Sequence, residues 1–350
     1  MIAVAYDVTS LAENRFGGIS EVCRQTLVQA SESGQVEPVA LYRRGDPTNI
    51  DISNVEKKHI SPLGGLVSRK FDIVHALGHR LPPTRGRKVV YTLHDAWSLY
   101  PNRYQGEEFQ RKIGARITDE LKRADAILAV SSATKEKLLE LGLVEPSRCF
   151  VVPNGVAEPG LPAKEAENRE IAALLEQDYV LFVGRLEVRK NVHHILEALL
   201  PARGLKLVIV GEKGYGGEQV EQELGRFPRE RLHRFTGLSR PDLDLLYRHA
   251  FASLQPSWEE GFGLPILEAM IRGCPVITSN RSGAAEVAGE AAVLVDPDHS
   301  EQSTAALEEI QANPGHRESL VAAGKRRAAQ FTWRSSFELT LSIYRRLLED

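Results

Sequence analysis

Both halves of the chain repeat one pattern, in which a short apolar run ends at a glycine or a polar turn and leads into a helical segment. The first run covers residues 2–6, and the pattern begins again at residues 179–183. A short and fully apolar run is typical of a strand buried on both faces of a parallel sheet. Strands that alternate with helices predict an α/β fold. A chain of 350 residues is too long for one compact core, so we expect two such domains.

The other apolar runs complete the two expected sheets. In the first half we expect strands at residues 36–41, 71–76, 89–93, 126–130 and 150–153. In the second half we expect strands at residues 206–210, 232–236, 252–255, 275–279 and 292–295. A stretch rich in proline, alanine and charge at residues 158–168 is the candidate linker. The expected domains are therefore 1–160 and 161–332, followed by an amphipathic helix in 333–350.

The composition is that of a globular protein, with 42% hydrophobic and 26% charged residues. A net charge of −3 argues against a nucleic-acid partner. Cys23, Cys149 and Cys274 are scattered and odd in number, which predicts a reducing compartment without disulfides or a metal cluster. Because the N-terminal residues do not resemble a signal peptide and no apolar stretch could span a bilayer, we expect a cytoplasmic protein.

The stretch at residues 255–272 joins a glycine-rich loop to the start of a helix. Pro265 suits the first helical turn, where an N–H group has no intrahelical partner. The N–H groups at such a helix start can bind phosphate. Glu260 in the loop and Glu268 in the helix can accept hydrogen bonds from hydroxyl groups. This stretch therefore predicts a ligand that combines phosphate with a hydroxyl-rich sugar.

A Gly17-Gly18 pair lies between the first strand and a helix expected at residues 19–31. Glycines at this point can let a phosphate group approach the backbone N–H groups closely. The pair also fits an ordinary turn from a strand to a helix. The residues alone favour neither interpretation.

Two cations follow the strand at residues 179–183 and its terminal Gly184. Arg185 can bind two phosphate oxygens at once, and Lys190 supplies a compact charge. The alternative is that both are surface charges beside the start of a helix. Their place directly after a fully apolar strand favours a diphosphate clamp.

His94 follows the strand at residues 89–93. A single histidine is more often structural than catalytic. In open α/β sheets, however, ligands bind beyond the carboxyl ends of the strands, where His94 is expected to lie. We therefore keep His94 as a candidate site residue.

The stretch at residues 255–272 resembles the signature of the retaining glycosyltransferases of family 4. That signature places two glutamates, separated by seven residues, in the phrase S-x-x-E-G-F-G-L-P-x-L-E-A-M. The matching residues are Ser257, Glu260, Gly261, Phe262, Gly263, Leu264, Pro265, Leu267, Glu268, Ala269 and Met270. The resemblance implies a GT-B fold, with two Rossmann-like doubly wound domains that face a cleft. It also implies that the first domain binds the acceptor, the second binds the donor, and the C-terminal helix crosses back to the first.

The resemblance extends to other loops and implies a set of site residues. Gly184, Arg185, Lys190 and Asn191 match a G-R-x-x-x-x-K-N motif. The implied catalytic residues are His94, Arg185, Lys190 and Glu260. The implied donor-binding residues are Gly17, Gly18, Arg185, Lys190, Gly237, Leu238, Glu260, Gly261, Phe262, Gly263, Leu264 and Glu268.

Each part of the donor has an implied partner in the resembled family. Arg185 and Lys190 stabilise charge on the β-phosphate, and the Gly17-Gly18 loop adds backbone N–H groups. Glu260 contacts the donor sugar, and His94 lies near that sugar and its phosphate. Glu268 holds the ribose hydroxyls, and the loop at Gly237 and Leu238 surrounds the nucleobase.

The chain departs from the family pattern at two positions. Ser282 stands where the family usually has the first of two glycines, while Gly283 keeps the second. A side chain at position 282 weakens the case for a close backbone approach there. Arg189 is an additional cation to which the resemblance assigns no role.

The implied activity is that of a retaining hexosyltransferase. The donor is a nucleotide diphosphate sugar, with mannose (as GDP-mannose) or glucose favoured, and the acceptor is a glycan or a lipid-linked glycan. Polysaccharide or lipopolysaccharide biosynthesis is the expected setting. No cofactor or metal is expected, because cations with a helix dipole can neutralise the leaving diphosphate.

The acceptor is expected to bind to three loops of the first domain, at residues 14–16, 78–84 and 97–106. Their aromatic and cationic side chains suit sugars or anionic carriers. These side chains are Arg15, Arg80, Trp97, Tyr100, Arg103 and Tyr104. The cationic helix expected at residues 109–123 has two interpretations, a solvated face or a peripheral contact with anionic lipid headgroups.

Three other functions remain to be weighed against this one. A nucleotide-sugar epimerase would share the fold and would act without an acceptor. A non-catalytic scaffold would bind the sugar nucleotide without turnover. A dinucleotide-dependent oxidoreductase is disfavoured, because no G-x-G-x-x-G motif follows the first strand.

Overall fold

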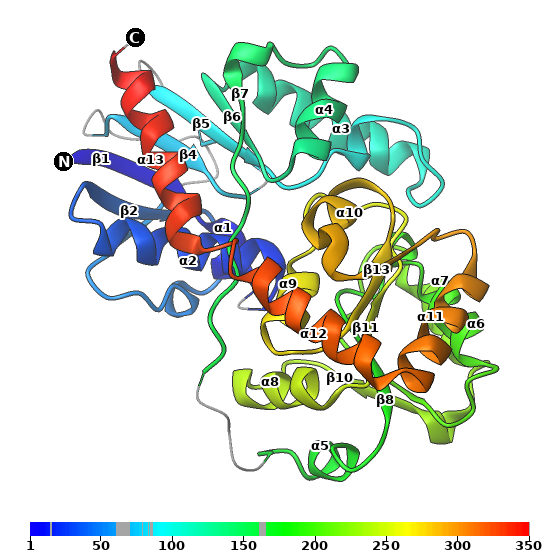
Figure 1. Cartoon of the computed structure of the whole chain (residues 1–350). Helices are drawn as coiled ribbons and strands as arrows, with labels where there is room; N and C mark the ends of the chain where they lie inside the picture. The colour runs from blue at the N-terminus through cyan, green and yellow to red at the C-terminus, as the bar shows by residue number, and fades with distance from the viewer. Residues whose placement is uncertain are drawn as a thin grey trace. The chain divides into compact units, whose positions relative to one another are not determined.

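The structure is a computed structural model that describes residues 1–14, 16–60, 71–78, 80–82, 84, 87–160 and 166–349. The chain forms two compact units (Figure 1). The first unit comprises Met1–Asn102, Gly106–Gly155 and Thr332–Asp350. The second unit comprises Arg103–Gln105 and Val156–Phe331. Part of the expected linker, residues 161–165, lies outside the described residues.

The first unit contains a parallel sheet of seven strands in the order β3-β2-β1-β4-β5-β6-β7. The strands are β1 (Ile2–Asp7), β2 (Val36–Tyr42), β3 (Glu56–His59), β4 (Ile73–Ala76), β5 (Lys88–Leu93), β6 (Ala126–Ala129) and β7 (Cys149–Val151). The main helices are α1 (Thr9–Glu13), α2 (Gly18–Glu32), α3 (Glu107–Arg123) and α4 (Ser132–Glu140). The expected α/β class and six of these strands are thereby confirmed.

The strand β3 was not predicted, because its sequence, EKKH, carries no apolar residue. It pairs with β2 alone and forms the edge of the sheet. An edge strand with charged side chains resists pairing with other chains, so its sequence lacks the apolar pattern of a buried strand.

The second unit contains a parallel sheet of six strands in the order β10-β9-β8-β11-β12-β13. The strands are β8 (Tyr179–Val183), β9 (Lys206–Val210), β10 (Leu232–Phe235), β11 (Ala252–Gln255), β12 (Val276–Ser279) and β13 (Val293–Val295). Its helices are α5 (Arg169–Leu174), α6 (Val192–Leu199), α7 (Gly217–Leu224), α8 (Arg240–His249), α9 (Leu264–Ile271), α10 (Ser282–Ala288), α11 (Ser300–Ala312) and α12 (Pro314–Ala328). All of the strands expected in this half are present.

Each sheet has one position at which the chain reverses the direction in which it adds strands. In the first unit this switch point lies between β1 and β4, and in the second it lies between β8 and β11. Loops at the carboxyl ends of the two flanking strands diverge there and leave room for a ligand. The topology therefore places a candidate ligand site at each switch point.

The C-terminal helix, α13 (Trp333–Glu349), belongs to the first unit and runs along α2 (Figure 1). Tyr344 of this helix is fully buried, and its hydroxyl lies 2.6 Å from Nδ1 of His75. The other ring nitrogen of His75 lies 2.8 Å from the hydroxyl of Thr92. Burial, followed by the proximity of His94, lowers the pKa of His75 to about 3, so this ring is neutral. The expected return of the last helix to the first domain is confirmed.

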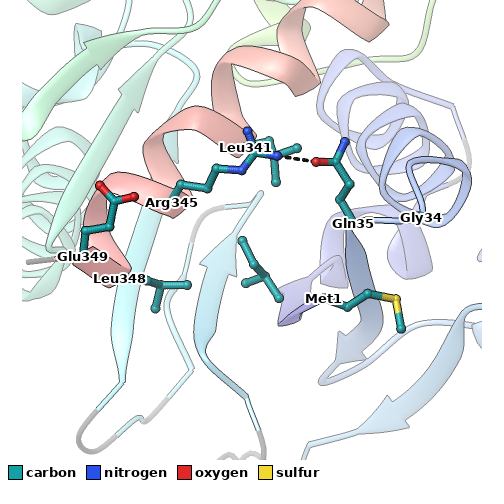
Figure 2. A pocket seen from close by; sticks show the side chains of 8 residues that line it. Met1, Gly34, Gln35, Leu341, Arg345, Leu348 and Glu349 are labelled. Atoms are coloured by element: carbon teal, nitrogen blue, oxygen red, sulfur yellow. Dashed lines mark hydrogen bonds between the residues drawn. The ribbon is translucent and has the colours of Figure 1, made fainter.

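A hollow of about 490 Å³ lies beside the end of α13, between that helix and the start of β1 (Figure 2). Arg345 donates a hydrogen bond to the side chain of Gln35 across it (Figure 2). None of the predicted site residues lines this hollow. Within the described ranges, no helix combines the length and apolar character that a membrane crossing requires.

Candidate active site

The switch point of the second unit is formed by the loops after β8 and β11. The loop after β8 ends in a short helix, η4 (Val188–Lys190), and Asn191 then adopts a left-handed conformation with φ of 55°. The Asn191 side-chain amide donates to the carbonyl oxygens of Pro256, at 3.2 Å, and Pro297, at 2.7 Å. These bonds attach the end of the β8 loop to the loops that follow β11 and β13.

The loop after β11 leads into α9, which begins at Leu264 with Gly263 as its N-cap. Phe262 is buried against the ring of Phe331, at 5.8 Å between centroids. Pro265 occupies the first turn, as the sequence predicts. The N–H groups at the start of α9 therefore come shortly after Glu260, Gly261 and the buried Phe262 in the sequence.

The Glu260 carboxylate lies between two cations. Its Oε1 is 2.6 Å from Nζ of Lys190, and its Oε2 is 3.0 Å from Nη1 of Arg189. The Ser257 hydroxyl donates a further hydrogen bond to Oε1, at 2.7 Å. Burial raises the pKa of Glu260, but the charges of Arg189 and Lys190 outweigh burial and lower it to about 2. Glu260 is therefore ionised at neutral pH.

The backbone of Glu260 is held by the first residues of α10. Its N–H donates to Oγ of Ser282, at 2.9 Å, and its carbonyl oxygen accepts from the N–H of Gly283, also at 2.9 Å. A Cβ on Gly283 would lie 2.3 Å from the carbonyl oxygen of Gly261, so only glycine fits there. Ser282 has a φ of 54°, a conformation that suits glycine better than serine.

Arg189 is the site residue to which the sequence assigned no role. Its side chain is 8% exposed. Besides Glu260, it contacts Glu187, at 3.3 Å, and donates to the backbone carbonyl of Glu259, at 2.5 Å. Its own carbonyl accepts from the N–H of Trp258, at 3.1 Å. The only sequence signal was its place beside Lys190, because Glu259 and Glu260 lie about seventy positions further on.

Arg185 has different surroundings from Lys190. Its side chain is exposed, and within the described ranges it makes no hydrogen bond or ion pair. Lys190 is buried and bonded to Glu260. The two predicted clamp cations thus flank one loop, but only Arg185 is directed to solvent without a protein partner.

Glu268 lies one helical turn into α9 and contacts side chains of α8. The hydroxyl of buried Tyr247 donates to Oε2 of Glu268, at 3.0 Å, and Arg240 lies 3.9 Å from its Oε1. Arg272 donates to the backbone carbonyl of Glu268 and pairs with Asp244, at 2.6 Å. The contacts with Tyr247 and Arg240 hold the Glu268 carboxylate against α8.

The predicted nucleobase loop follows β10 on the outer side of the same sheet. Gly237 is exposed with a φ of 61°, and Leu238 is half-buried. A Cβ built on Gly237 would meet no atom within 4 Å, so its surroundings are open.

His94, Gly17 and Gly18 belong to the first unit. Nε2 of His94 lies 2.7 Å from the carbonyl oxygen of Leu77, which can only accept, so this nitrogen carries the hydrogen. Burial lowers the pKa of His94, partly offset by that hydrogen bond, so the ring is neutral and Nδ1 is an acceptor. Gly17 and Gly18 open α2, and a Cβ on Gly17 would meet only the hydroxyl of Ser20, at 3.9 Å.

Comparisons with known proteins decide the family. The family described as "Glycosyl transferases group 1" matches residues 163–327, and "Glycosyltransferase Family 4" matches residues 55–158. O-antigen chain mannosyltransferase B of Escherichia coli is 31% identical over 275 residues, which cover 76% of this chain and 72% of that protein. The chain is a family 4 glycosyltransferase. With such relatives it is, more specifically, a hexosyltransferase.

Solved structures show the same fold for this glycosyltransferase. Sucrose-phosphate synthase from Thermosynechococcus elongatus is similar with a TM-score of 0.78 and 19% identity, over 100% of both chains. The HepE protein of Anabaena, solved in complex with UDP-glucose, is similar with a TM-score of 0.76 and 18% identity, over 98% of this chain and 100% of that one. The expected GT-B fold is confirmed.

Two residues that the sequence placed in an acceptor loop belong to the second unit of the glycosyltransferase. Arg103 pairs with Asp298, at 2.5 Å, and its guanidinium lies 4.1 Å from the centre of the Trp258 ring. Tyr104 donates a hydrogen bond to Glu259 and stacks on Trp258, with ring planes 10° apart. The side chains that were expected to contact an acceptor thus bind the loop that carries Glu260.

The other predicted acceptor residues give less information. Arg15 lies outside the described residues, as does part of the loop at 78–84. The Arg80 carbonyl accepts a hydrogen bond from Arg43, at 3.2 Å. Among the described residues, no three His, Cys, Asp or Glu side chains form a group that could hold a metal ion.

Proposed function

We propose that this glycosyltransferase moves a hexose, mannose or glucose, from a nucleotide diphosphate sugar to a glycan or a lipid-linked glycan. We further propose that the anomeric configuration is retained and that no metal takes part. The observation that carries the proposal is the ionised Glu260, fixed between two cations at the start of α9. The mannosyltransferase of E. coli and the UDP-glucose complex of HepE support this donor class. Synthesis of a surface polysaccharide or lipopolysaccharide is the corresponding setting.

The leaving diphosphate gains negative charge as the bond between the sugar and the β-phosphate breaks. Exposed Arg185 and the Lys190 ammonium would meet this charge together with the N–H groups that open α9. Cations and helix N-termini stabilise such charge when they are already in place before the reaction. In this proposal, the Gly17-Gly18 loop would supply further N–H groups to the diphosphate. This set would make a metal ion unnecessary.

The other donor groups would use the remaining side chains. Glu268, oriented by Tyr247, would accept hydrogen bonds from the ribose hydroxyls. Gly237 and Leu238 would lie beside the nucleobase. Glu260 would accept hydrogen bonds from the sugar hydroxyls, which suits a carboxylate whose pKa is about 2.

Retention would follow from attack on the face that the phosphate leaves. The acceptor oxygen forms a bond to the anomeric carbon as the bond to phosphate breaks, and the acceptor proton passes to the departing phosphate oxygen. Neutral His94 would lie near the reacting carbon and accept a hydrogen bond at Nδ1. Glu260 is not the nucleophile in this scheme, so a trapped glycosyl–Glu260 adduct would contradict it.

The first test is thermal denaturation with GDP, UDP, ADP, dTDP or NAD. A ligand at 100 times its dissociation constant should add about 2.7 kcal/mol to the free energy of unfolding. We expect one nucleoside diphosphate to stabilise the protein, after which its sugar conjugates are tested for transfer and product anomer by NMR. Stabilisation by NAD alone would contradict the proposal. Sugar isomerisation without an acceptor would indicate an epimerase, and binding without turnover would indicate a scaffold.

A further inference from the structure

The two cations that hold Glu260 differ in how many acceptors the protein provides for their N–H groups. The Arg189 guanidinium contacts three acceptors, which are the Glu260 and Glu187 carboxylates and the Glu259 carbonyl. The Lys190 ammonium has three N–H groups, and Glu260 Oε1 is its acceptor among the described residues. Arg189 is therefore committed to the protein, whereas Lys190 can bind another anion.

The Lys190 side chain is largely buried, with 11% of its surface exposed. Its ammonium lies against Gly184, where a Cβ would be 3.8 Å from Nζ, and no side chain stands on that residue. The lysine follows the loop after β8 at the switch point, where a ligand of the sheet is expected. A diphosphate bound there would compete with Glu260 for the ammonium.

A carboxylate that loses its cation while buried becomes unstable and tends to take up a proton. Glu260 is 12% exposed, so the loss of Lys190 would affect it in this way unless a second cation remained. Arg189 is that cation, and it binds the other carboxylate oxygen. It also holds both neighbours of Glu260 on the N-terminal side, through the Glu259 carbonyl and the Trp258 N–H.

We propose that Arg189 is a positioning residue that keeps Glu260 ionised and in place while Lys190 exchanges Glu260 for a phosphate oxygen of the donor. This inference rests on the proposed function, because it requires a diphosphate donor. It assigns binding of the diphosphate to Lys190 and placement of the sugar-binding carboxylate to Arg189. Removal of Arg189 should therefore lower kcat, whereas removal of Lys190 should weaken binding of the diphosphate.

The test compares Arg189→Gln, Arg189→Lys and Lys190→Gln with the wild type. Arg189→Gln should lower kcat at least tenfold and change the dissociation constant of the nucleoside diphosphate less than threefold. Lys190→Gln should weaken binding of that diphosphate at least tenfold and should weaken binding of the corresponding monophosphate less. Arg189→Lys should restore most of kcat. The matched control is Arg234→Gln, which removes an arginine from an exposed pair with Glu221 and should change neither parameter.

The pH dependence of kcat gives a readout that a purely structural role would not move. The charged groups facing Glu260 are Arg189 and Lys190, with Glu187 beyond Arg189. Without Arg189, the carboxyl should titrate at or above its ordinary pKa of about 4.3. Arg189→Gln should therefore lose activity below about pH 5, where the wild type and Arg189→Lys keep theirs.

Several outcomes would overturn the inference. One such outcome is an equal kcat in the wild type and Arg189→Gln. Another is an equal loss of diphosphate affinity in Arg189→Gln and Lys190→Gln. Either would show that the two cations do not have separate roles. If Arg189→Gln does not fold, a pH profile of Arg189→Lys with an acid loss near pH 5 would contradict it as well. A wild type that binds no nucleoside diphosphate would instead contradict the proposed function, and the exchange at Lys190 with it.

Discussion

At the scale of single residues, the site is organised around Glu260. Both of its carboxylate oxygens, its backbone N–H and its backbone carbonyl oxygen have a partner in the protein. Glu260 is bonded through its side chain to Arg189, Lys190 and Ser257 and through its backbone to the start of α10. A group held from so many directions needs little reorganisation when a ligand binds. The residue that departs from the family pattern, Ser282, takes part in this arrangement.

We predict that Ser282→Ala is less stable than Ser282→Gly. Ser282 has a φ of 54°, which costs a side-chain-bearing residue about 1 kcal/mol. Alanine keeps that cost and removes the acceptor of the Glu260 N–H, which adds about 1 kcal/mol or more. Glycine removes the same acceptor but relieves the backbone. Thermal denaturation measures both variants, and an alanine variant as stable as the glycine variant would show that the backbone is not strained.

At the scale of secondary-structure elements, the first unit is fastened by a buried polar network. His75 on β4 bonds Tyr344 on α13 and Thr92 on β5, so three elements meet at one ring. The buried imidazole makes these hydrogen bonds in its neutral form. The bonds therefore depend on pH, because protonation would charge the ring. The polar network also specifies which face of α13 is buried. Apolar packing alone would specify that face less strictly.

We predict that His75 makes the folded state less stable as the pH falls from about 6.5 towards 3. The folded-state pKa of His75 lies below its unfolded value, so the unfolded chain binds more protons in this range and stability rises with pH. His75→Gln should reduce this slope by up to about 1.4 kcal/mol per pH unit. Urea denaturation at several pH values measures the slope.

The control for this prediction is His193→Gln in α6, because the His193 side chain is 57% exposed. Burial lowers the pKa of His94 and His194 as well, so part of the slope should remain in the His75 variant. A slope unchanged by His75→Gln would mean that His75 is protonated in the folded protein.

At the scale of the whole molecule, both units are doubly wound sheets, and each has one switch point at which the loops of the flanking strands diverge. In the second unit, this point carries Arg185, Lys190 and the start of α9. These groups are positive or present N–H groups, and in the proposed reaction they meet the charge of the leaving diphosphate. We therefore propose that this site acts without a divalent cation.

We predict that sugar transfer proceeds at an unchanged rate after dialysis against EDTA. The physical reason is that Arg185, Lys190 and the α9 N-terminus stabilise the same developing charge that a metal ion would stabilise. The measurement is transfer of labelled hexose with EDTA and with added Mg²⁺ or Mn²⁺. A rate that falls at least tenfold in EDTA and returns with one metal would contradict metal independence.

The sequence by itself determined the fold class, most of the strands and the position of the main site loops. Strands such as 179–183 are fully apolar because both faces of a parallel sheet are buried, so a local pattern reveals them. The signature around Glu260 and Glu268 is also contiguous, and it identified the family. The charged edge strand β3 escaped notice because it lacks that pattern.

Only the tertiary structure decided the partners within the site. Arg189 meets the carbonyl of Glu259 across 70 positions of sequence, and Arg103 meets Asp298 across 195. Ser282, whose φ is positive, likewise bonds to Glu260 of another loop. No local pattern encodes such pairs, because they exist only once parallel strands bring the ends of distant loops to one edge of a sheet.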